Sequence, residues 1–88
     1  MKDEGVRGEI QHRLADLRAA YPRISGAHAV LEDWREGREH RYALRLDVRL
    51  PQHQSLVSGG ARDSAQAAVR AALDAASERM ASLAARRT

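Results

Sequence analysis

Apolar and polar residues alternate with a period of two between Arg41 and Leu50. The apolar positions are Tyr42, Leu44, Leu46, Val48 and Leu50, and the positions between them are Arg41, Ala43, Arg45, Asp47 and Arg49. Because successive side chains of a strand point to opposite faces, this pattern predicts a half-buried β-strand over 41–50. Its apolar face needs an amphipathic cover, and its other face presents three arginines to the surroundings.

Two amphipathic helices are expected to supply that cover. From Val6 to Tyr21 the apolar residues recur every three or four positions, which indicates one stripe of an α-helix. Pro22 should end it, since the residue before a proline is pushed away from helical geometry. The polar residues 1–5 are expected to be frayed. A second helix is expected from Ser64 to about Arg86, with Asp63 and Gln66 in the spacing of a capping box.

Two further strands are predicted beside the central one. Residues 27–34 (AHAVLEDW) suit a short strand, and the polar run 35–40 has the charge and glycine of a hairpin connection. Pro51 should stop the central strand, residues 52–54 should turn, and residues 55–58 should form a third strand. The expected order is helix, three antiparallel strands, helix. Residues 1–88 are therefore predicted to form a single two-layer α+β domain with both helices on one sheet face.

Composition narrows the function classes further. An 88-residue chain without phenylalanine builds its core from Leu, Val, Ile and Ala, and so thin a core argues against a deep substrate pocket. Cysteine is absent, so disulfides and thiolate metal sites are excluded. No apolar run has the length of a membrane span and no signal-peptide core follows Met1, so a cytoplasmic protein without a membrane partner is expected.

Arginine dominates the charge. Fourteen of the 15 basic residues are arginine, and the net charge is +3. A planar guanidinium suits phosphate oxygens, so Arg41, Arg45 and Arg49 on the outer strand face are candidates for contact with a nucleic-acid backbone. The alternative is a solvated face on which Glu32 and Asp47 pair with these arginines.

The final helix carries a second group of candidate contacts. Arg70 and Arg79, with Arg86 and Arg87 beyond them, form a candidate basic ridge. Asp74 follows Arg70 by four residues and Glu78 precedes Arg79, so pairs within the helix are the competing interpretation. The C-terminal arginines also suit the negative end of the helix dipole without any ligand.

Other chemistry finds little support in the sequence. His12, His28, His40 and His53 are dispersed and no carboxylates accompany them at ligand spacing, so we predict no metal site and no cofactor. Gly59-Gly60 lacks the Lys and Ser of a phosphate-binding loop, and no nucleophile lies at a known spacing from a base. We therefore expect no catalytic residues and no small-molecule substrate. Trp34 suits either base stacking or cover for the sheet edge.

Several segments together resemble one known family. Tyr21-Pro22-Arg23-Ile24 ends the first helix, Tyr42 to Pro51 reads YALRLDVRLP, Leu56-Val57-Ser58 follows, and Val69 to Met80 reads VRAALDAASERM. In this order and spacing they resemble the ribosome hibernation-promoting factor family, and in particular its short ribosome-associated members. The resemblance covers residues 14–83.

The resemblance implies a cytoplasmic bacterial protein that binds the small ribosomal subunit near the decoding region and blocks translation under stress, without catalysis. It implies rRNA contacts from basic residues of helices and loops, which here are Arg23, Arg70 and Arg79. Contacts from Arg45 and Arg49, or from Arg35 and Arg38 in the hairpin, are suggested by local charge alone.

The chain departs from the family in two places. The family's hairpin is often rich in histidine, whereas this chain has Asp33-Trp34-Arg35-Glu36-Gly37. The family has a strand before its first helix, and residues 1–5 are too short and too charged to supply it. The strand 27–34 is therefore expected to have an exposed edge. Either the given start lies downstream of the natural one, or another chain covers this edge.

Two alternatives follow from the same order of elements. A double-stranded RNA-binding domain has this order too, although Asp63, Ser64 and Gln66 stand where that family has lysines. The other alternative is a protein-interaction module that forms a homodimer through the strand 27–34 edge, with its arginines only increasing solubility.

Overall fold

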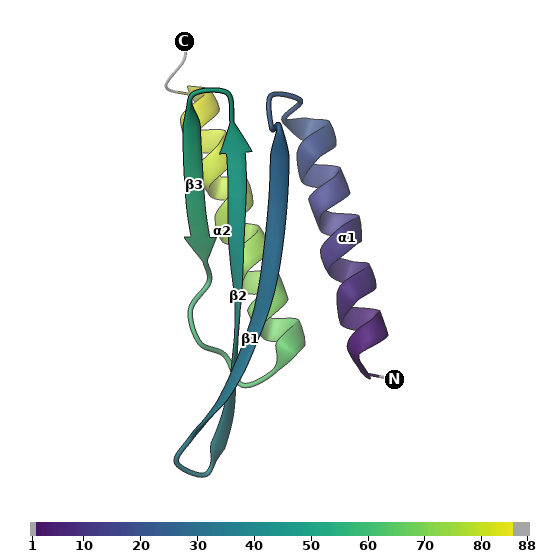
Figure 1. Cartoon of the computed structure of the whole chain (residues 1–88), viewed down its shortest axis with the longest axis vertical. Helices are drawn as coiled ribbons and strands as arrows, with labels where there is room; N and C mark the ends of the chain where they lie inside the picture. The colour runs from purple at the N-terminus through teal and green to yellow at the C-terminus, as the bar shows by residue number, and fades with distance from the viewer. Residues whose placement is uncertain (1, 86–88) are drawn as a thin grey trace.

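The computed structural model describes the backbone of residues 2–85 and the side chains of residues 5–85. Its elements are α1 (Lys2–Ala20), β1 (Gly26–Glu36), β2 (Glu39–Leu50), β3 (His53–Ser58) and α2 (Ala65–Ala85). The strands form one antiparallel sheet in the order β1-β2-β3, with β2 in the centre (Figure 1). The predicted α+β order of helix, three strands and helix is confirmed.

The predicted element boundaries were too short at the polar ends. The pairing of β1 with β2 continues as far as Glu36↔Glu39, and only a two-residue turn separates the two strands. Residues 35–40 therefore belong largely to the strands. Gly37 adopts φ 64°, the conformation that the first loop position of a type II′ hairpin needs. All of residues 35–40 are exposed. A strand segment with both faces in solvent shows no alternation of apolar and polar residues, so the sequence did not reveal it.

The helix and third-strand boundaries moved for related reasons. α1 begins at Lys2 rather than Val6, and β3 begins at His53 rather than Ser55. Both extensions consist of polar residues, which carry no hydrophobic period. Met1, in the segment expected to be frayed, and Arg86, at the predicted end of the last helix, lie outside the described residues.

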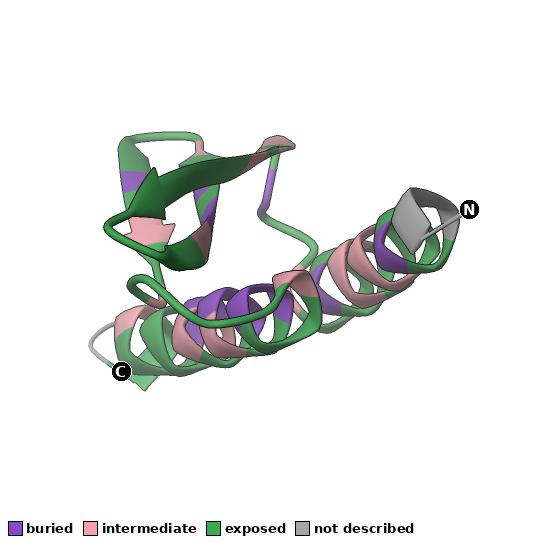
Figure 2. Ribbon diagram, turned by 90° about the horizontal axis from the view of Figure 1, so that it is seen from below, coloured by how far each residue is buried: buried purple, intermediate pink, exposed green. Residues whose placement is uncertain are grey.

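The core lies between the sheet and the helices: α2 covers one sheet face, and α1 lies on the same side, beside α2 and beyond the edge of β1 (Figure 2). Leu44, Leu46 and Val48 of β2 are at most 1% exposed, as the alternation predicted. They pack in one cluster with the α2 residues Val69, Ala72, Leu73, Ala76 and Met80. The small alanines let α2 lie close to the sheet, and Val6 and Leu17 anchor α1 to the same cluster.

The junction between β3 and α2 is unusually tight. A Cβ atom built on Gly59 would lie 2.5 Å from both the carbonyl carbon and the Cβ of Ala71. The backbone of the chain therefore passes directly against α2 at this position, and glycine is the residue that allows the approach. The pair Gly59-Gly60, considered from the sequence only as a phosphate-binding loop, therefore has a packing role at Gly59.

The cap of α2 differs from the predicted capping box. The Ser64 hydroxyl accepts a hydrogen bond from the Ala67 N–H at 3.1 Å, so Ser64 is the N-cap residue. Asp63 instead accepts a hydrogen bond from Arg41 at 2.6 Å. The prediction placed the cap one residue too early because both Asp63 and Ser64 are good capping residues.

β1 is an edge strand, as expected from the missing partner on its outer side. Within the described residues it pairs only with β2. Ala27, Ala29 and Leu31 on its inner face are half-buried, since α1 packs beside α2 and leaves this part of the sheet less covered. Neither described helix is both long enough and apolar enough to cross a membrane.

Candidate nucleic-acid interface

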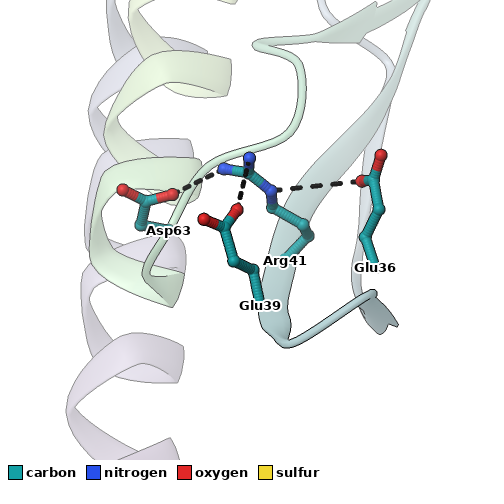
Figure 3. Close-up of polar contacts among 4 residues, drawn as sticks. All are labelled: Glu36, Glu39, Arg41 and Asp63. Atoms are coloured by element: carbon teal, nitrogen blue, oxygen red, sulfur yellow. Dashed lines mark hydrogen bonds and ion pairs between the residues drawn. The ribbon is translucent and has the colours of Figure 1, made fainter.

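The outer face of the sheet holds the three strand arginines, but they are not equivalent. Arg41 lies among three carboxylates, at 2.8 Å from Glu39, 2.6 Å from Asp63 and 4.0 Å from Glu36 (Figure 3). Its side chain is only 30% exposed. Through these pairs Arg41 joins the hairpin arm to the segment before α2. Because acidic groups already surround its guanidinium, it is poorly placed to bind a phosphate.

Arg45 and Arg49 each approach a single carboxylate. Arg45 lies 3.5 Å from Glu32, and Arg49 lies 3.7 Å from Asp47. Both arginine side chains are about two-thirds exposed, at 65% and 67%. Exposed pairs of this kind contribute roughly 0–1 kcal/mol, so a phosphate can replace the carboxylate at small cost. The pairing that the sequence offered as an alternative is present, and it leaves both arginines available.

The structure separates Arg70 from Arg79. They lie nine residues apart, which is about 2.5 turns of helix, so they point to opposite sides of α2. Arg70 pairs with Glu9 of α1 at 3.5 Å, and Arg13 of α1 pairs with Asp74 at 3.0 Å. The competing interpretation, pairing within the last helix, does not hold for Arg70: α1 packs along this side of α2 and offers partners from another element.

Arg79 lies on the other side of α2, away from α1. It forms no ion pair with any side chain that the structure describes. The same holds for Arg23 in the loop between α1 and β1. Of the three residues that the family resemblance selected, two therefore have no ion pair with a described side chain, and Arg70 is paired between the helices. Arg86 and Arg87, the rest of the expected ridge, lie outside the described residues.

Arg23 borders a cavity of about 580 Å³ at the end of the molecule where α1 and α2 both finish (Figure 1). The cavity lies between the loop 21–25, the turn joining β2 to β3, and the last turns of α2. Its apolar walls come from Tyr21, Leu50, Met80 and Leu83. The backbone of Arg49 lies next to the loop 21–25, since its carbonyl accepts a hydrogen bond from the Ser25 N–H at 2.8 Å.

Sequence reasoning missed this cavity. Its walls come from three segments separated by about thirty residues of chain, and no local pattern joins them. The only sequence signal was the pair of X-Pro steps, Tyr21-Pro22 and Leu50-Pro51, which end an element on each side of the opening.

The remaining candidates are scattered. His12 lies 3.5 Å from Asp16, and His40 lies 3.2 Å from Asp33 and stacks on Tyr42. Among the side chains that the structure describes, no three His, Asp or Glu residues gather as a metal site requires. Trp34 is 38% exposed on the hairpin arm, where it pairs with Arg41 in the strand register, and it does not line the cavity.

Comparison with family models, with curated proteins and with solved structures found no match for this chain. The case for a function therefore depends on the geometry above and on the residues of this sequence.

Proposed function

We propose that this chain is a ribosome-associated protein that binds the small subunit through rRNA backbone contacts. It silences translation by occupying an rRNA site, as the resemblance to the hibernation-promoting factors implies, and it acts in the cytoplasm without catalysis. The observation that carries the proposal is the set of available arginines at the cavity end. Arg23 has no ion pair in the described part of the chain, and Arg49 has only an exposed one.

The pairing pattern separates arginines that hold the fold together from arginines that are available to a ligand. Arg41 and Arg70 connect elements of the fold through carboxylates. Arg23 and Arg79 form no ion pair with a described side chain. Arg45 and Arg49 each have one exposed ion pair, and replacing its carboxylate by a phosphate costs little free energy. A phosphate backbone attracts such cations without regard to base sequence, and the attraction weakens as salt rises.

The test is co-sedimentation of the purified protein with isolated small ribosomal subunits over a series of salt concentrations. We expect binding near physiological salt that fades steeply as salt increases. Replacing Arg45 and Arg49 together by Glu should weaken binding and flatten its salt dependence. Absence of binding at every salt concentration would overturn the proposal.

Silencing needs its own measurement. Added to a cell-free bacterial translation reaction, the protein should lower the rate of synthesis in proportion to the fraction of small subunits it occupies. A protein that binds subunits while synthesis continues unchanged would remain ribosome-associated, and the silencing part of the proposal would be wrong.

The double-stranded RNA-binding domain is the second candidate, since the observed order of helix, three strands and helix is also its order. The start of α2 argues against it. Asp63 lies there in an ion pair with Arg41, where that class of domain places lysines toward phosphates. Binding of plain duplex RNA as tightly as small subunits would favour this candidate.

The open edge of β1 is compatible with the other alternative, a protein-interaction module that forms a homodimer through this strand. An edge strand of 11 residues offers backbone groups to a second copy of the chain. A concentration-dependent mass together with no RNA affinity at physiological salt would favour a homodimer through this edge over the ribosomal proposal.

A further inference from the structure

The cavity at the end of α2 has the size and lining of a ligand site. Its volume of about 580 Å³ falls within the range of roughly 300–1,000 Å³ that small-molecule sites occupy. Tyr21, Leu50 and Leu83 pack against the core from its walls, so they are held in place by the fold. Pro22 and Pro51 stiffen the two loops at its opening.

None of the described side chains that line the cavity is acidic. Its polar lining, within the described part of the chain, comes from Arg23, Gln52 and His53. This differs from Arg41, which three carboxylates surround. An apolar cleft beside a cation that lacks a carboxylate partner in the described structure is complementary to a ligand with a flat apolar part and a negative charge.

We propose that this cavity receives an unpaired RNA base, with Arg23 on the phosphate of the same nucleotide. The inference rests on the proposed function, and it adds the place and the kind of RNA contact. Tyr21 supplies an aromatic face for the base, and Gln52 and His53 supply hydrogen-bonding groups for its edge.

The base has to be unpaired, because bases inside a duplex are stacked and their faces are not accessible to protein side chains. Stacking on aromatic and apolar walls accepts any base, so the contact selects exposed loops and bulges rather than a sequence. The resulting preference for single-stranded RNA separates this site from simple attraction of phosphates to the arginines.

The test compares two substitutions on the same helix. Ala84 and Ala81 are both exposed residues of α2, three positions apart, but only Ala84 lines the cavity. Ala84→Trp should fill the cavity and lower the affinity for a short single-stranded RNA and for small subunits about tenfold, since one stacked base contributes roughly 1–3 kcal/mol. Ala81→Trp should leave both affinities within about twofold, as expected for a surface change away from the contact.

A second pair guards against a folding defect in the first. Ala20 lines the cavity from the end of α1, whereas its exposed neighbour Ala19 does not. Ala20→Trp should repeat the loss and Ala19→Trp should not. Circular dichroism on all four variants shows which of them are folded, and binding is compared only among these.

The outcomes separate the two proposals. Wild-type protein that binds small subunits while folded Ala84→Trp and Ala20→Trp bind as tightly would overturn the base site and leave the proposed function standing. Equal wild-type affinity for the single strand and for its duplex would also overturn the base site. Wild-type protein that binds neither subunits nor RNA would overturn both.

Discussion

Gly59 is the residue whose identity the packing constrains most directly. Any side chain there meets the backbone of α2 at Ala71 and Ala72, and a backbone cannot rotate away as a flexible side chain can. Gly26 offers the contrast, because nothing lies within 4 Å of the position its Cβ would take.

We expect Gly59→Ala to destabilise the fold by about 1–3 kcal/mol, as other overpacked positions do. For a domain of this size, that corresponds to a fall in Tm of roughly 4–24 °C. The matched variant Gly26→Ala should change stability by no more than about 0.5 kcal/mol. Thermal unfolding followed by circular dichroism measures both, and an equal Tm for the two variants would contradict the tight junction.

The elements themselves were largely readable from the sequence, and the contacts between them were not. The alternation of Leu44, Leu46 and Val48 with polar residues predicted β2, because a strand with one buried face has an apolar residue at every second position. The partners of Arg70 could not be read in the same way. They depend on which side of α2 receives α1, and local spacing carries no information about that choice.

The cavity shows the same limit in the candidate site. Arg23 was identified from a local resemblance, but its surroundings come from Leu50 and Leu83, which are distant in sequence. Hydrophobic residues at the ends of elements look alike in a sequence whether they finish the core or line an opening. Only the packed structure distinguishes the two.

Arg41 reinforces the contact between β2 and the segment just before α2, which are paired there by an isolated backbone bridge. Next to it, the N–H groups of Tyr42 and Arg62 each donate to the other residue's carbonyl, at 2.9 and 2.7 Å. The guanidinium adds the contact with Asp63 just before α2. The arm of the β1–β2 hairpin is thereby anchored to the helix layer at its base.

Arg41→Gln should destabilise the protein by about 1–2 kcal/mol, since it leaves three neighbouring carboxylates without their shared cation. Amide hydrogen exchange at Tyr42 and Arg62 should become faster, which reports the loss of the local anchor. Arg45→Gln removes a single exposed pair and should cost less than about 0.5 kcal/mol. Equal effects of the two substitutions in urea unfolding would argue against a special role for Arg41.

At the scale of the whole molecule, the hairpin tip and the cavity lie at opposite ends of a body 48 Å long and 16 Å thick (Figure 1). Arg35 and Arg38 lie at the tip and Arg23 at the cavity end, and none of them has an ion pair among the described residues. Since charges more than about 10 Å apart are largely screened at moderate salt, the two ends act separately.

This separation allows a test in which net charge is held equal. Replacing Arg23 and Arg79 by Glu changes the net charge from +3 to −1, because each substitution removes two units, and replacing Arg35 and Arg38 by Glu does the same. The first pair should weaken subunit binding at least about tenfold and lower the salt slope by about two. The second should change affinity less than about threefold. Equal losses would mean that binding follows total charge rather than a local surface.

The uneven composition of β1 also governs how the protein behaves when concentrated. Residues 26–31 of this open edge carry no acidic or strongly basic side chain, whereas four of residues 32–36 are charged. Charges on an edge strand discourage the edge-to-edge pairing that produces aggregates and fibrils. Residues 32–36 have such charges, and residues 26–31 do not. We therefore expect aggregation at high concentration to begin at residues 26–31, and we expect Val30→Lys at this exposed position to reduce it.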